Sequence, residues 1–164
     1  MRNPFICLLP VALLIAGCSH WISEQSRALA DRTVTYSHLR ENPEAYRGKF
    51  VLLGGIVAAV THTDEGTRLE VVEHRLDSRE LPDQVVPSRG RFLATTPESL
   101  DPAKYKPGAL VSMMGEMTGK ELQLQGGAEY AYPVIAIREI RAIELPEIHP
   151  EYYYGDRHPF FRGR

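Results

Sequence analysis

Cysteine is nearly absent from this chain. The 164 residues include only Cys7 and Cys18, and Cys7 lies in an apolar segment that we expect to be removed from the mature protein. A mature chain with one cysteine excludes an internal disulfide framework, a multi-cysteine metal site and an iron–sulfur cluster. The folded domain must therefore be stabilised by its own hydrophobic core.

An excess of charge of either sign is also missing. The 19 Lys and Arg residues nearly balance the 21 Asp and Glu residues, so the chain lacks the basic surface typical of nucleic-acid binders. Nucleophile-elbow, P-loop and dinucleotide-binding motifs are absent as well. These absences predict a protein that is not an enzyme and that has no nucleic-acid partner.

The amino terminus has the pattern of an export signal. Arg2 precedes an apolar run over residues 5–16, which is too short for a membrane span of roughly 20 residues but fits a secretory h-region. The following Leu-Ile-Ala-Gly-Cys segment, residues 14–18, resembles the lipobox of bacterial lipoproteins. We therefore predict a signal peptide over residues 1–17, and diacylglycerol and an N-acyl chain on Cys18 as the only attached groups. Ser19 favours the outer membrane, with the domain facing the periplasm.

The remainder divides into a lipidated tether (residues 18–36), a domain (37–146) and an extended or mobile tail (147–164). Within the domain, segments of alternating or β-branched apolar residues predict strands. They lie at residues 50–60, 69–73, 90–94, 109–117 and 132–145. The first strand is expected to be buried on both faces or bent at Gly54-Gly55, and the last to contain a bulge near Arg138-Glu139, where its apolar residues change parity. Five strands with a short helical insert between the third and fourth predict an all-β, small OB-like barrel with short helical inserts.

Two similar turns punctuate the domain. Asn42-Pro43 is followed by Tyr46, and Asp101-Pro102 is followed by Tyr105. Proline suits the first helical position after an Asn cap, so we expect a helix of one or two turns after Asn42. We interpret both motifs as strand entries in which a tyrosine closes one end of the barrel.

Candidate binding residues are few. The six histidines form no helical pair of the zincin type, and the nearest ligand-like grouping is His149 with His158 in the tail. This grouping leaves open a second function, a periplasmic small-molecule or metal-binding lipoprotein that holds zinc or copper through its tail. Tyrosines offer contacts for a glycan or an envelope protein: Tyr130, Tyr132, Tyr152, Tyr153 and Tyr154. The alternative interpretation is that Tyr130 and Tyr132 pack the barrel.

The order of these motifs resembles a known family. The lipobox, the turn over residues 43–49, the Gly54-Gly55 strand, the Leu100–Tyr105 turn and Tyr132-Pro133-Val134 follow one another as in the Slp family of outer-membrane lipoproteins, over roughly residues 10–146. The resemblance implies an envelope lipoprotein associated with starvation or stress, with no established enzymatic activity. We therefore expect a non-enzymatic structural or binding module at the outer membrane.

Overall fold

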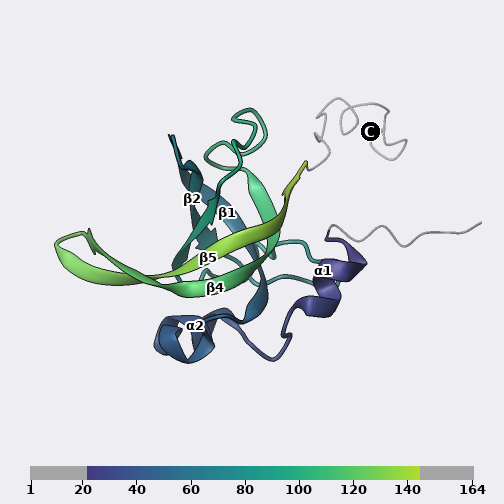
Figure 1. The fold of residues 1–164 in the computed structure, drawn as a ribbon, viewed down its shortest axis with the longest axis horizontal. Coiled ribbons are helices and arrows are strands. Elements are labelled where there is room, and N and C mark those ends of the chain that lie inside the picture. The colour runs from purple at the N-terminus through teal and green to yellow at the C-terminus, as the bar shows by residue number, and fades with distance from the viewer. Residues whose placement is uncertain (1–21, 145–164) are drawn as a thin grey trace, which may run out of the picture.

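Five strands form a closed barrel in the computed structural model, which describes residues 22–144 (Figure 1). The strands are β1 (Phe50–Thr63), β2 (Gly66–Glu73), β3 (Arg91–Thr96), β4 (Leu110–Gln125) and β5 (Ala128–Ile143). Their order around the barrel is β1-β2-β3-β5-β4, with β3 and β5 parallel and the other pairs antiparallel. This arrangement confirms the predicted OB-like fold.

The strand patterns explain how the barrel is filled. Residues of β2 alternate between buried and half-buried, and Leu69 and Val71 point into the core. Both faces of β1 are covered in its first half, which is one of the two arrangements expected from the sequence, and the second half is largely exposed. A Cβ on Gly54 would lie 2.7 Å from the backbone oxygen of Val111 and 2.5 Å from Leu76 Cδ2. Glycine is thus needed at this position because a loop side chain and the neighbouring strand both approach the backbone closely.

The predicted bulge in the last strand is present. Met114 pairs with Glu139, and the next residue, Gly115, pairs with Ile137, so Arg138 has no partner across the ladder. Because of the extra residue, apolar side chains before and after it face the same side of the sheet although their positions differ in parity. Ile135 is consequently buried in the core, and Ile140, five residues later, also packs against it.

Three short helices precede the barrel: α1 (Glu24–Leu29), α2 (Tyr36–Glu41) and a single 3₁₀ turn (Pro43–Tyr46). The helical turn predicted after Asn42 is therefore confirmed. The tether predicted over residues 18–36 overlaps the folded domain from Ile22 onward. Ile22 is fully buried and Val34 is 8% exposed, because the amino-terminal segment packs on the barrel and does not hang from it.

The helical insert predicted between the third and fourth strands is wrong. Residues 97–109 form turns, in which Lys104 and Tyr105 donate their N–H groups to the carbonyl of Asp101 at 3.1 and 3.0 Å. One turn forms after Asp101-Pro102. Pro107-Gly108 follows shortly after it, so the segment is too short to continue as a helix. Tyr105 nevertheless packs against the core, as does Tyr46 in the related motif.

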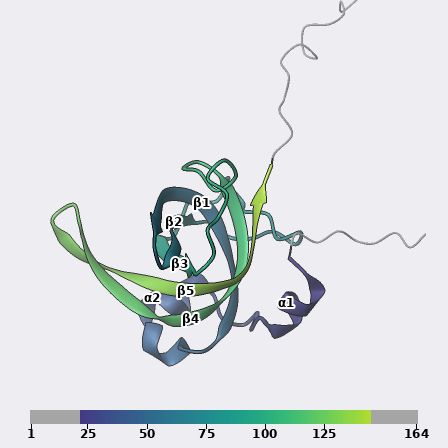
Figure 2. The same ribbon diagram turned by 45° about the horizontal axis from the view of Figure 1, so that its top comes forward.

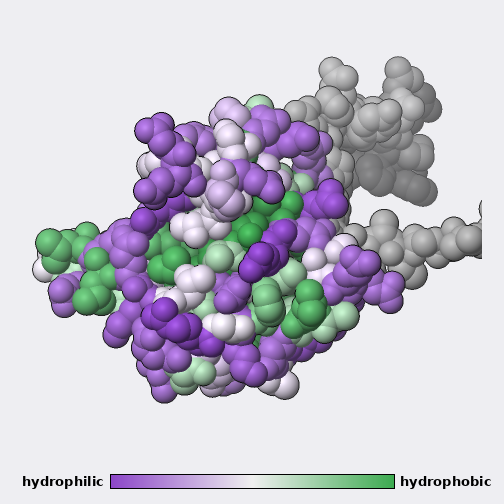
Figure 3. Space-filling model, viewed as in Figure 1, coloured by the Kyte–Doolittle hydropathy of each residue, from purple (hydrophilic) through white to green (hydrophobic). Residues whose placement is uncertain are grey.

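A hairpin extends beyond the barrel at its β4–β5 end (Figure 2). Gly126 and Gly127 join the two strands with φ angles of 60° and 87°, the left-handed conformation of a two-residue type I′ turn. Leu122 and Leu124 are 54% and 80% exposed, and apolar surface is visible at the hairpin tip in Figure 3. Helix α1 lies at the opposite side of the barrel in both ribbon views.

Candidate functional site

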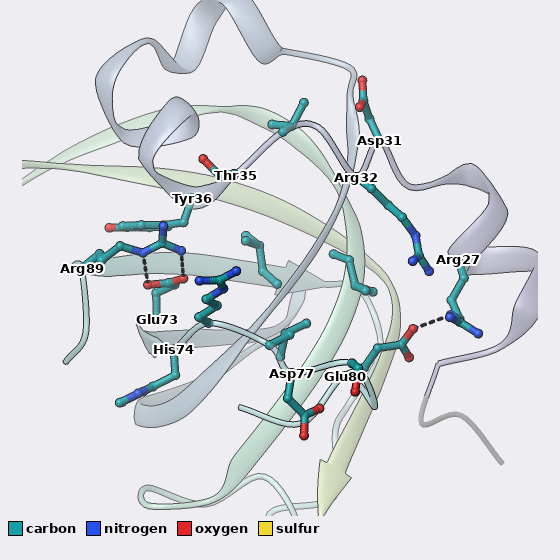
Figure 4. A pocket seen from close by; sticks show the side chains of 16 residues that line it. Arg27, Asp31, Arg32, Thr35, Tyr36, Glu73, His74, Asp77, Glu80 and Arg89 are labelled. Atoms are coloured by element: carbon teal, nitrogen blue, oxygen red, sulfur yellow. Dashed lines mark hydrogen bonds and ion pairs between the residues drawn. The ribbon is translucent and has the colours of Figure 1, made fainter. Parts of the chain in front are cut away.

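A pocket of about 470 Å³ lies between the amino-terminal segment and the β2–β3 loop (Figure 4). Residues from α1 through the start of α2 form one wall, and the loop after β2 forms the other. Leu52 and Leu53 of β1 contribute from the barrel. This volume falls in the range of small-molecule sites, about 300–1,000 Å³.

The wall formed by the β2–β3 loop is shaped by one aspartate. The Asp77 carboxylate accepts the N–H groups of Arg79 and Leu81 at 2.8 and 2.9 Å. The N–H of Asp77 donates to the Leu81 carbonyl at 2.9 Å, next to an isolated bridge between Leu76 and Pro82. These hydrogen bonds lower the pKa of the Asp77 carboxyl below its ordinary value. An aspartate that bonds backbone groups two and four residues ahead stabilises a tight turn.

Glu80 connects this loop to two other parts of the fold. Its backbone is in the left-handed region, with φ of 68°, which non-glycine residues seldom adopt. Its carbonyl accepts the Ser112 hydroxyl of β4, and its buried carboxylate accepts the N–H of Ile22 at 3.3 Å. The same carboxylate forms an ion pair with Arg27. The strained conformation therefore directs one side chain onto the amino-terminal segment.

A second buried carboxylate lies at the other end of the pocket. Glu73 is 2% exposed and receives two bonds from Arg89, at 2.6 Å from Nη2 and 3.3 Å from Nε. The hydrogen bond to Glu73 raises the pKa of Arg89. The Arg89 guanidinium also lies over the Tyr36 ring, 6.0 Å from its centroid. Burial raises the pKa of the Tyr36 phenol, so its hydroxyl stays protonated and donates to the Arg91 carbonyl at 2.9 Å.

The remaining charges of the pocket are not balanced. Each lining carboxylate has a cationic partner: Arg27 for Glu80, Arg89 for Glu73, Lys49 for Asp31 and Arg79 for Asp77. Two further arginines line the pocket, Arg32 and Arg75. Within residues 22–144, neither guanidinium has a carboxylate partner, and Figure 4 shows Arg32 directed into the pocket. Arg32 and Arg75 therefore present two solvent-exposed guanidinium groups without a carboxylate partner at this site.

Another carboxylate fixes the amino-terminal segment from the barrel side. Glu139 of β5 accepts the N–H of Ser23 at 3.0 Å and its hydroxyl at 2.6 Å. Partial burial raises the pKa of the Glu139 carboxyl, but the hydrogen bonds from Ser23 and Ser26 outweigh burial and hold that pKa below its ordinary value. Together Glu80 and Glu139 hold Ile22 and Ser23 on the barrel.

The tyrosines considered as contacts divide into two groups. Tyr132 is 2% exposed and its hydroxyl donates to Glu70 at 3.2 Å. Tyr130 accepts the N–H of Arg91 at 3.1 Å and lies against the Tyr36 hydroxyl at 3.3 Å. Tyr132 is thus buried in the barrel, as the alternative interpretation held, whereas Tyr130 is half-buried with its ring 4.6 Å from that of Tyr132. Tyr152, Tyr153 and Tyr154 lie outside the described residues.

Cys18, His149 and His158 also lie outside the described residues. In the part of the chain between Ile22 and Glu144, no group of three His, Cys, Asp or Glu side chains is placed to hold a metal ion. The helices within that range are too short and too polar to cross a membrane.

The sequence analysis missed the pocket. Its arginines come from three separate segments, and the only local signal is the charged, proline-containing stretch of residues 77–89, a composition that is also typical of a surface loop. Spacing along the chain did not indicate that Arg32 and Arg75 line the same cavity.

Comparison with known proteins identifies the family. The model of the outer membrane lipoprotein Slp family matches residues 15–163. This chain belongs to that family. Two relatives of the Slp-family chain come from Escherichia coli (strain K12). One is the "Uncharacterized lipoprotein YeaY", 32% identical over 122 residues that cover 70% of this chain and 63% of YeaY. The other is the "Outer membrane protein Slp", 25% identical over 142 residues that cover 86% of this chain and 75% of the relative.

The match to YeaY thus spans less than two thirds of that relative's length. Family membership confirms the predicted identity as an outer-membrane lipoprotein.

Among solved structures, the Slp-family chain has partial similarity to single-stranded DNA-binding proteins. The mitochondrial protein Rim1 from S. cerevisiae gives a TM-score of 0.39 at 10% identity, over 59% of this chain and 96% of that one. A small single-stranded DNA-binding protein from Streptomyces coelicolor gives 0.35 at 14% identity, over 58% and 94%. The DNA binding is a property of those proteins.

Proposed function

We propose that this Slp-family lipoprotein is a non-enzymatic binding module, held against the periplasmic face of the outer membrane by lipid on Cys18. The observation that carries the proposal is the attachment of Ile22 and Ser23 to the barrel through Glu80 and Glu139. Ile22 is four residues after Cys18, a stretch that spans at most about 14 Å when fully extended. A lipid on Cys18 would therefore keep the barrel close to the bilayer surface.

The strength of the anchor supports this arrangement. Each buried methylene of an acyl chain contributes about 0.8 kcal/mol, so diacylglycerol with an added N-acyl chain makes attachment stable. The connection between lipid and domain is short because Ile22, four residues after Cys18, is held on the barrel by Glu80. The partner of the module would be another component of the envelope, encountered near the membrane surface.

The arrangement of polar groups supports a binding role over a catalytic one. Both buried carboxylates of the pocket are neutralised by arginines, Glu73 by Arg89 and Glu80 by Arg27. Elsewhere Thr67 Oγ1 lies 3.3 Å from His62 Nδ1, a pairing that resembles an activated hydroxyl. Thr67 is 2% exposed and its hydroxyl accepts the N–H of Leu100 at 3.0 Å, so its role is to fix the loop after β3.

Processing of Cys18 tests the anchoring. The Cys18→Ala variant is expected to lose palmitate labelling and to accumulate as the precursor, and globomycin is expected to cause the same accumulation of the unchanged protein. Ser19→Ala provides the matched control, because it alters the neighbouring residue and keeps the acceptor thiol. Normal processing of Cys18→Ala, or absence of label from the unchanged protein, would rule out the anchored module.

A further inference from the structure

The pocket between the amino-terminal segment and the β2–β3 loop contains arginines that its own carboxylates do not neutralise. Arg32 and Arg75 line it without a carboxylate partner in the described part of the chain. Arg27 uses its Nε atom for Glu80, and within residues 22–144 its terminal nitrogens have no hydrogen-bond partner. Guanidinium donors from three places thus remain available at one cavity.

We infer that this pocket binds a phosphate group, through Arg32 and Arg75 with Arg27 beside them. A phosphate monoester carries close to two negative charges at neutral pH and has three terminal oxygens, so it matches two guanidinium groups in charge and in acceptors. A carboxylate offers a single charge and two oxygens, which leaves one of the two arginines without a counterion. The acids at the rim, Asp31 and Asp77, do not prevent binding because Lys49 and Arg79 already accompany them.

The frame around these arginines is rigid enough to hold a ligand. The turn at Asp77 and the left-handed Glu80 fix the β2–β3 wall, and the Glu80 carboxylate joins that wall to Arg27 and Ile22. A non-glycine residue in the left-handed region costs about 1 kcal/mol or more, and such strain is concentrated at sites of function. The walls of the pocket are therefore connected to each other before a ligand arrives.

The source of the phosphate follows from the proposed function, on which this part of the inference rests. The segment that forms one wall begins four residues after Cys18, so a lipid-anchored chain holds the pocket close to the bilayer. Phosphatidic acid is a phospholipid whose headgroup is a phosphate monoester, so it presents there the charge and the oxygens that match the two arginines. A soluble phosphate ester has the same chemistry, and the experiment separates the two sources.

The first arm of the test uses glycerol 3-phosphate as a soluble probe. The mature protein, purified in a neutral detergent, is titrated with this probe by calorimetry, with acetate as the carboxylate comparison. Saturable binding with a Kd below about 1 mM is expected, and weaker binding of acetate. The Arg32→Gln/Arg75→Gln variant should lose affinity by roughly tenfold or more. Lys104→Gln/Lys106→Gln, which removes the same charge from an exposed loop, should bind like the unchanged protein.

This arm does not depend on the anchor, so it separates failure of the pocket from failure of the proposed function. Absence of saturable binding overturns the phosphate site, as does an equal loss in the lysine variant or equal binding of acetate. A folded state of the arginine variant is verified by its unchanged urea midpoint.

The second arm places the mature lipoprotein in nanodiscs of phosphatidylcholine, with or without phosphatidic acid. Slower hydrogen exchange over residues 74–81 with phosphatidic acid, abolished in Arg32→Gln/Arg75→Gln, assigns the phosphate to a lipid headgroup. Unchanged exchange in these nanodiscs, together with binding of glycerol 3-phosphate in the first arm, assigns it to a soluble ester and overturns the headgroup as its source.

Discussion

Ile22 provides the most direct measure of how firmly the amino-terminal segment belongs to the fold. Its side chain is fully buried, although the segment around it is polar and contains only short helices. Truncating a buried isoleucine to alanine removes three methyl or methylene groups and leaves a cavity, at a cost of about 2–5 kcal/mol. We expect the Ile22→Ala variant to lose about 3 kcal/mol of unfolding free energy.

Urea denaturation of the mature domain measures this loss. With a slope of about 1.5 kcal/mol/M for a domain of this size, the midpoint should fall by about 2 M. The matched control is Leu29→Ala in α1, whose side chain is 62% exposed, so its unfolding free energy should stay within about 0.5 kcal/mol, and its midpoint within about 0.3 M, of the unchanged protein. Equal and small effects of the two substitutions would show that Ile22 adds no stability and that the short connection to Cys18 is a free tether.

Two further substitutions test the contacts around the barrel. Gly90 has φ of 148°, and a Cβ there would collide with the hydroxyls of Tyr36 and Tyr130, so Gly90→Ala should destabilise the domain by about 2 kcal/mol or more in the same assay. A midpoint equal to that of the unchanged protein would contradict this packing. In the folded protein the pKa of the Glu139 carboxyl lies below 4.5. The charged carboxylate therefore stabilises the contact with Ser23 above pH 4.5, and this contribution is lost as the pH falls through the pKa of Glu139 in the folded state. The protection factor of the Ser23 amide, its intrinsic exchange rate divided by the observed rate, should therefore fall at acidic pH in the unchanged protein and be low at every pH in Glu139→Gln; a protection factor that does not change with pH in the unchanged protein would refute the contact.

The barrel was readable from the sequence because its strands carry burial patterns. The parity change of the isoleucines in the last strand required a bulge, and Arg138 is the residue left unpaired. The apolar residues at both parities of the first strand indicated burial on both faces or a bend at Gly54-Gly55, and Leu76 and the neighbouring strand cover Gly54. In both strands, the order of apolar residues and glycines within the strand indicated how that strand is bent or covered.

Other features depended on contacts between distant residues. The strand pattern over residues 109–117 continues into a hairpin whose leucines are exposed, so no buried face indicated its length. The amino-terminal segment was interpreted as a tether because isolated apolar residues such as Ile22 and Val34 show no period. The pocket was missed because it depends on Glu80, whose left-handed backbone conformation has no signature at a glutamate.

The parallel contact between β3 and β5 has a consequence for how an exported chain folds. Only three residue pairs, Leu93 with Val134 through Thr95 with Ala136, join these strands and close the barrel. A chain that emerges from a translocation channel amino terminus first cannot form them until residue 136 has crossed. Up to that moment β3 has an open edge that is able to pair with other chains. The last strand to arrive thus ends the period in which the protein is vulnerable to aggregation.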